Sequence, residues 1–288
     1  MRLCRGQGYD GAGNMSGKYI GASTLIKIQF PLAIYTHCCS HRLNLCLSTS
    51  CQMQLVRNML GTLEKAILFF ENSQKRLNQL KKDVKEVLGD NHPEINLIML
   101  CLTRWIEKID SMHRFREAFS AVMKTYDTIQ LNSDKNWNSA SCVDAQGLYR
   151  ACGNFEFIMV LVIVERVFSV TRDATVLLQD REIDLFTAYR EVKNVRAALK
   201  KIRDNVDQHH AKWFNEAKKM AKDVAVSPTK RRICNIQRNR ENYDTPDCET
   251  YYRCAATIPF LDHVIHQIDE RFNATTEPVV VGFVLIPT

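Results

Sequence analysis

One carboxylate, Asp10, lies inside a glycine-rich stretch that runs from Gly6 to Gly17. Glycines allow unusual backbone angles and the close approach of a ligand or a second chain, so this turn is a candidate for chemistry. An aspartate ahead of a glycine also forms turns, and it caps helices such as one starting near Asn14. Asp10 is therefore the first candidate site residue, and the local sequence leaves both roles open.

A Cys-x-x-His pair, Cys38 and His41, is the second group of reactive side chains, with His37, Cys39 and Cys46 nearby. A structural zinc ion needs four ligands, commonly as two well-separated Cys and His pairs. No second pair stands out among the 11 cysteines, and no Cys-x-x-Cys occurs. We therefore predict no metal site, and a buried cysteine with a hydrogen-bonded histidine is an equal interpretation of this pair.

Positive charge is concentrated between residues 185 and 240, which hold 15 Lys and Arg against 5 Asp and Glu. Such an excess attracts polyanions, nucleic acid first, while a solvated helical face is the plain alternative. Trp213 and Phe214 are too few for a base-stacking platform, so contact would be with backbone phosphates. The candidate nucleic-acid-binding residues are Arg190, Lys193, Arg196, Lys200, Arg203, Lys230, Arg231 and Arg232, together with Lys218, Lys219 and Lys222.

The composition is that of a globular protein, with 45% apolar and 25% charged residues in 288. The longest apolar run, Phe157 to Val164, has eight residues, far fewer than the roughly 20 of a membrane helix. No signal-peptide-like apolar stretch opens the chain. An odd number of scattered cysteines fits a reducing compartment, nucleus or cytosol, better than a secreted disulfide scaffold.

The elements that must hold these side chains are mostly helices. A helix ending before Pro31 and a short buried strand over 33–38 are expected first. Apolar residues at helical spacing predict helices over 55–70 and 77–87, with a stop at 89–93, then one helix from 103 to 126 that buries Trp105. Residues 131–145 read as a polar loop, and 185–206 as a helix whose basic stripe (Arg190, Lys193, Arg196, Lys200 and Arg203) is free to meet solvent or a partner.

Five segments, in order, resemble the hAT transposase superfamily, in its domesticated zinc-finger-MYM-like and THAP-repressor-like branch. The glycine-rich Asp10 turn and the Cys38-x-x-His41 segment are the first two. The others are Thr103-Arg-Trp105, Leu177-Leu-Gln-Asp-Arg-Glu-Ile-Asp-Leu185, and Tyr251-Tyr-Arg followed by Pro259-Phe-Leu-Asp-His263 and Arg271-Phe272. Each segment is weak alone, but the five occur in the right order across about 270 residues, which makes the resemblance strong.

This resemblance implies a mainly α fold, with a partial RNase H-like α/β remnant over 1–45, a helical insertion over 46–272 and a tail over 273–288. In the family, three acidic residues bind two Mg²⁺ or Mn²⁺ ions that drive DNA strand cleavage and transfer. Asp10 matches the second acid; the first is expected upstream of residue 1 and the third beyond Thr288. Asp110, Glu117 and Glu165 have no feature that recommends them as replacements.

We therefore expect a chain without catalysis of its own, in which Asp10 is a vestigial ligand, no cofactor is held, and Cys38 and His41 organise the site or touch DNA. Its partner would be DNA through the basic 185–240 segment. Alternatives are a helical protein-interaction module without DNA binding, and a partial gene product of an active transposase. The resemblance also implies a nuclear location and, because the dimerisation region would follow Thr288, no family-type dimer.

Overall fold

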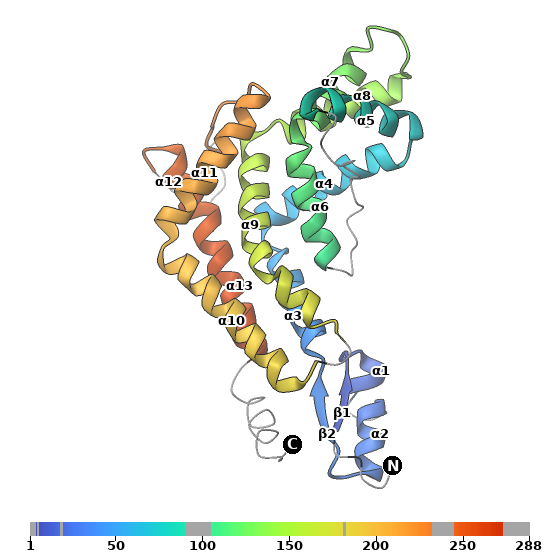
Figure 1. Ribbon diagram of the computed structural model, residues 1–288, viewed down its shortest axis with the longest axis vertical. Helices are drawn as coiled ribbons and strands as arrows, with labels where there is room; N and C mark the ends of the chain where they lie inside the picture. The colour runs from blue at the N-terminus through green and yellow to red at the C-terminus, as the bar shows by residue number, and fades with distance from the viewer. Residues whose placement is uncertain are drawn as a thin grey trace, which may run out of the picture.

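The computed structural model describes residues 4, 6–17, 20–89, 105–180, 183–231 and 245–272. Its described part is mainly helical, as the sequence predicts, and it is elongated, with a small α/β unit at one end of a larger helical body (Figure 1). No helix in these ranges is long and apolar enough to span a membrane. An RNase H-like core is not confirmed by a two-stranded sheet alone.

The α/β unit consists of β1 (Gly6–Tyr9), α1 (Gly13–Ser16), α2 (Ala22–Gln29) and β2 (Ile34–His37). The strands are parallel, with Gly6 opposite Ile34 and Tyr9 opposite His37, so both end at the same edge. Helix α2 ends before Pro31, as predicted, because proline has no N–H to continue the helix. The expected buried strand is wrong in one respect: within the described residues β2 pairs with β1 alone, and Ile34 is 51% exposed.

Three helices follow: α3 (Cys39–Ser50), α4 (Gln54–Glu71) and α5 (Gln74–Leu88). The predicted apolar period of α4 is confirmed, with Leu63 and Phe70 fully buried. In α5 Leu80 and Val84 are buried, but Val87, expected on the same face, is 39% exposed. Gly89 stops α5 with a φ of 86°, a backbone angle that favours glycine. A domain boundary after residue 45 would cut α3, which packs against the far end of the chain.

The next helices are α6 (Trp105–Glu117), α7 (Phe119–Leu131) and α8 (Ser139–Cys152). The single helix expected up to residue 126 is wrong, because Ala118, with a ψ of 0°, separates α6 from α7. The polar loop expected over residues 131–145 is shorter in the structure, because α8 begins at Ser139. Asn138 accepts a hydrogen bond from the Ser141 N–H (2.8 Å) and starts α8 within it, as N-cap residues do.

The helical body is built around α9 (Phe155–Leu177), whose residues 157–164 are all apolar and buried, so this part of the helix is central (Figure 1). Around it lie α10 (Leu185–Asp204), α11 (Val206–Asp223), α12 (Cys248–Tyr252), the π-helical turn η1 (Arg253–Thr257) and α13 (Ile258–Arg271). Fully buried His210 joins α11 to η1: its Nε2 donates to the Glu249 carbonyl (2.9 Å), and its Nδ1 accepts from the Thr257 hydroxyl (2.8 Å).

Candidate functional site

Asp10 lies directly after β1, at the edge where both strands end. It is exposed, and its Oδ1 accepts a hydrogen bond from the Ala12 N–H (3.1 Å), which is the turn-forming geometry. His37, at the end of β2, donates from Nε2 to the Asp10 carbonyl (3.0 Å). Gly11 has a φ of 76°, and a Cβ there would lie 2.4 Å from His37 Nε2. The turn therefore needs glycine beside Asp10.

The Cys38-x-x-His41 segment begins α3 next to this turn. Exposed Cys38 precedes the helix, and the His41 ring stacks on the His37 ring with centroids 5.5 Å apart. Burial raises the pKa of the Cys39 thiol to about 11 and that of Cys46 to about 12, which favours the protonated thiol in both. Within the described ranges, no three His, Cys, Asp or Glu side chains are placed to hold a metal ion.

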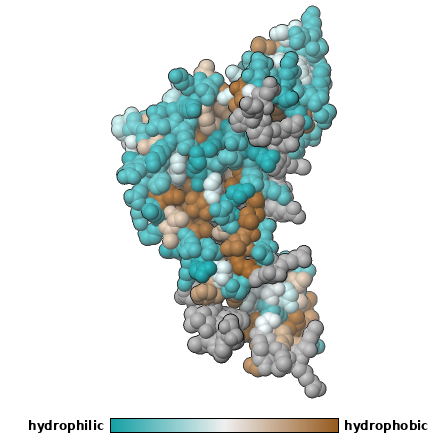
Figure 2. All heavy atoms as spheres, viewed as in Figure 1, coloured by the Kyte–Doolittle hydropathy of each residue, from teal (hydrophilic) through white to brown (hydrophobic). Residues whose placement is uncertain are grey.

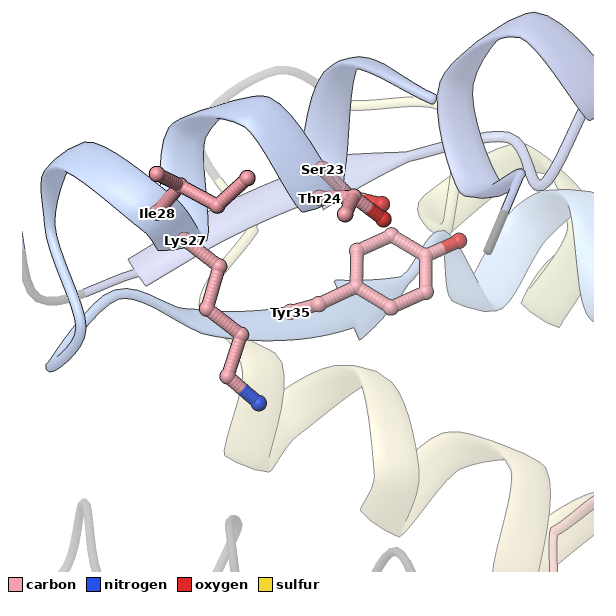
Figure 3. Close-up of a pocket in the computed structure, with 5 residues that line it drawn as sticks. All are labelled: Ser23, Thr24, Lys27, Ile28 and Tyr35. Carbon is pink, nitrogen blue, oxygen red and sulfur yellow. The ribbon is translucent and has the colours of Figure 1, made fainter. Parts of the chain in front are cut away.

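A small pocket of about 330 Å³ opens between α2 and β2, lined by Ser23, Thr24, Lys27, Ile28 and Tyr35 (Figure 3). The Tyr35 hydroxyl is buried without a hydrogen-bond partner among the described residues. Burial, and then the charge of Asp10, raise the pKa of Tyr35. Sequence reasoning missed this pocket, although the spacing of Ser23, Thr24 and Lys27 on one helical turn was a usable signal. These lining residues offer hydroxyl groups and the Lys27 ammonium group, and none of them carries a carboxylate.

The basic stripe of α10 was expected to be free, and this is wrong for two of its five residues, Arg196 and Arg203, which pair with acidic residues of α13. Arg203 forms two hydrogen bonds with Asp262 of α13 (2.6 and 3.2 Å), and Arg196 pairs in the same way with Asp269. The two arginines are seven residues apart, and so are the two aspartates, so both pairs bridge the same faces of α10 and α13. These guanidinium groups hold two helices together.

Four other members of the predicted set also have polar partners inside the protein. Lys200 lies 3.5 Å from Asp204, Arg190 3.7 Å from Glu191, and Arg231 3.5 Å from Glu156. Lys230 donates to the Thr245 carbonyl (2.6 Å). Lys193 is exposed, and Arg232 lies outside the described residues. The backbone of Trp105 starts α6, but its side chain is outside what the structure describes.

The outer face of α11 carries a different set of cations. Lys212, Lys219 and Lys222 are exposed and form no ion pair with any residue in the described ranges. Lys218 is exposed as well, with its Nζ 5.3 Å from the centroid of the Phe214 ring. The opposite face, with Trp213 and Ala217, is buried. We name Lys212, Lys218, Lys219 and Lys222 the α11 lysine face.

The three acids considered as replacements for catalytic residues all form ion pairs. Asp110 lies 2.9 Å from Arg172, and Glu117 lies 3.3 Å from His113. Glu165 is 2% exposed, so it is no ordinary surface acid; it lies 3.1 Å from Arg116 and 3.2 Å from His113. Asp110 and Glu165 join α6 to α9, whereas Glu117 pairs within α6, and the three carboxylates do not converge on Asp10.

Comparison with known proteins gives one coarse relation. The chain is 30% identical over 278 residues, 95% of its length, to the Homo sapiens protein named 52 kDa repressor of the inhibitor of the protein kinase. The Mus musculus protein of the same name is 30% identical over 280 residues, again 95% of the chain. The chain spans 36% of the length of these relatives. No family model and no solved structure matches it.

Proposed function

We propose that the chain is a domesticated hAT-transposase-derived protein that works by binding DNA, without strand cleavage, in the nucleus. The similarity to proteins named as repressors, along 95% of the chain, supports such a binding role. The five segments that resemble the hAT superfamily support the ancestry. The observation that carries the DNA contact is the α11 lysine face, whose cations are exposed and whose Lys212, Lys219 and Lys222 have no acidic partner among the described residues.

The absence of strand cleavage is proposed from the surroundings of Asp10. Two-metal chemistry needs several carboxylates converging on a pair of ions. Asp10 instead shares its edge of the sheet with His37, Cys38 and His41, and its oxygen caps the turn at Ala12. The Tyr35 pocket beside it adds hydroxyl groups and Lys27, which suit an anion better than a divalent cation. Mg²⁺ or Mn²⁺ would be expected only in a complete parent enzyme.

The mode of binding follows from the side chains. Lysine ammonium groups on a helix surface neutralise phosphates as point charges, and they carry no base-specific geometry. The aromatic rings of α11 are turned inward, with Trp213 and Phe214 buried, so bases cannot stack on them. The proposal is therefore salt-sensitive binding to duplex DNA with little sequence preference.

A charge-reversal experiment tests the lysine face. The Lys219→Glu/Lys222→Glu variant is compared with Lys82→Glu/Lys85→Glu on α5, which changes the same charge at the same spacing on another exposed helix. Fluorescence anisotropy with a labelled duplex should show binding weakened about tenfold or more by the α11 variant only. Equal weakening by both variants would mean that only the net charge matters, and the assignment to α11 would be wrong.

The other two functions remain open to test. A helical protein-interaction module is favoured if the wild-type chain shows no salt-dependent DNA binding at all. An active transposase requires metal-dependent nicking of DNA with Mg²⁺ or Mn²⁺ that is lost in Asp10→Asn. The account predicts no nicking by the wild-type chain.

A further inference from the structure

Helices α5 and α8 lie at the end of the helical body away from the α/β unit (Figure 1). Residues of α4, α5 and α8 line a groove there. Its volume is about 530 Å³. The side chains that give it its chemistry are Lys65, Phe69, Arg76, Val143, Asp144 and Ala151, with Gly147 between them. It lies on different elements from both the Asp10 turn and the α11 lysine face, so neither of those sites explains it.

One wall of the groove carries positive charge without compensation. The Arg76 guanidinium lies 4.2 Å from the centroid of the Phe69 ring, which orients it by a cation–π contact. Its Nε is buried and has no hydrogen-bond acceptor among the described residues. Lys65, at a neighbouring position on α4, is exposed and forms no ion pair within the described ranges. Lys65 and Arg76 therefore line the groove without forming an ion pair with any carboxylate in the described residues.

The opposite wall, from α8, is smooth and largely apolar. Val143 is 67% exposed, and Ala151 is exposed one further helical repeat along. Gly147 lies between them, and a Cβ added there would meet no atom within 4 Å, so this wall is open. Asp144 is the one acidic side chain that lines the groove in the described structure. The groove thus combines an apolar wall with an excess of positive charge.

We propose that this groove docks an acidic peptide segment of a partner protein. A carboxylate of that segment approaches the Arg76 guanidinium and the Lys65 ammonium, which supplies the missing anionic partner. An aliphatic side chain next to the carboxylate lies against Val143, Gly147 and Ala151. The charge of the groove selects an acidic partner, and the exposed valine selects one that also carries apolar groups.

The test uses a short fluorescein-labelled peptide of alternating glutamate and leucine, followed by fluorescence polarisation. Two comparison peptides replace glutamate with lysine or leucine with serine. We expect saturable binding of the first peptide only. Arg76→Gln should weaken it about tenfold, the usual scale of one charge-assisted hydrogen bond. Gly147→Leu should weaken it similarly by filling the groove, and it raises helix propensity rather than lowering stability.

Two controls keep the result interpretable. Arg57→Gln removes the same charge from an exposed position of α4 that does not line the groove, and it should leave the affinity unchanged. Lys219→Glu/Lys222→Glu should also leave it unchanged, which separates this site from the proposed DNA contact. The proposal is overturned if the peptide does not bind, if the lysine peptide binds equally well, or if both groove variants keep the wild-type affinity. Displacement of the peptide by duplex DNA would assign the groove to nucleic acid and overturn it as well.

Discussion

His210 is held in the interior of the helical body in its neutral form. Burial, the largest influence, lowers its pKa from 6.5 to about 4. Its two ring nitrogens are both satisfied, by the Glu249 carbonyl and the Thr257 hydroxyl. In the unfolded chain the same ring titrates near 6.5, so only the unfolded state gains a proton between these two values.

The pH dependence of stability follows from this difference. The contribution of neutral His210 is fully present above pH 6.5 and is lost as the pH falls toward 4, by up to roughly 3 kcal/mol in total. Urea unfolding at pH 7 and pH 5 should show this loss in the wild type. It should be smaller in His210→Gln, whereas the neighbouring control His209→Gln should keep it. An identical pH dependence in His210→Gln would contradict the assignment.

Gly11 is the residue on which the Asp10 turn depends. Gly11→Ala should cost roughly 1–2 kcal/mol locally, because of its positive φ and the contact with His37 Nε2. Hydrogen exchange in β1 and β2 should become faster. Gly13→Ala is the matched control, since a Cβ at Gly13 meets no atom within 4 Å. Equal exchange in both variants would mean that the turn tolerates a side chain.

At the scale of elements, α10 and α13 are joined by the Arg196–Asp269 and Arg203–Asp262 pairs. These side chains are partly exposed, so each pair should contribute only about 0.5–1 kcal/mol. A double-mutant cycle with Arg203→Gln and Asp262→Asn measures this coupling. Arg203→Gln should leave DNA affinity unchanged within about twofold; a large loss would return the α10 stripe to the nucleic-acid surface.

The α/β unit exposes several large apolar side chains, and Figure 2 shows brown atoms in this lower part of the molecule. Ile20, Leu25, Ile28, Leu32 and Ile34 are between 51% and 86% exposed. Ile28→Lys/Leu32→Lys should therefore lower the binding of a hydrophobic dye with little change in stability. Leu131→Lys, at an equally exposed apolar position in α7, should lower it less. No difference between the variants would show that these side chains form no common patch.

Local features of the chain predicted local structure well. The apolar period of α4, the stop at Gly89 and the break at Pro31 depend on neighbouring residues, and the structure confirms them. The Asp10 turn could be located for the same reason. The helix break at Ala118 could not, because neither glycine nor proline marks it, and a polar composition concealed the start of α8 at Ser139.

Long-range pairing is where the sequence was insufficient. The spacing of Arg196 and Arg203 correctly placed both on one face of a helix, but their partners Asp269 and Asp262 lie 73 and 59 residues away. Only the packing of α13 on α10 reveals that this face is occupied. The sequence places the lysines of α11 within the basic segment. Which face of the helix is exposed follows only from the packing, in which Trp213 and Ala217 are buried.

At the scale of the whole molecule, the described residues form a helical body with an α/β unit at one end (Figure 1). The basic side chains of α10 and α11, in the 185–240 segment, lie in two different environments. Arg196 and Arg203 of α10 bind aspartates of α13 and so join two helices of the body, while the α11 lysine face points outward. This division is the central claim, because it places any DNA contact on one named surface.

The most direct test measures the association constant for duplex DNA at several salt concentrations, for the wild type and for Lys219→Gln/Lys222→Gln. Each phosphate contact contributes about −0.9 to the slope of log K against log salt. The account predicts a steep negative slope for the wild type and a slope shallower by about 2 for the variant. Equal slopes, or a wild-type slope near zero, would contradict it.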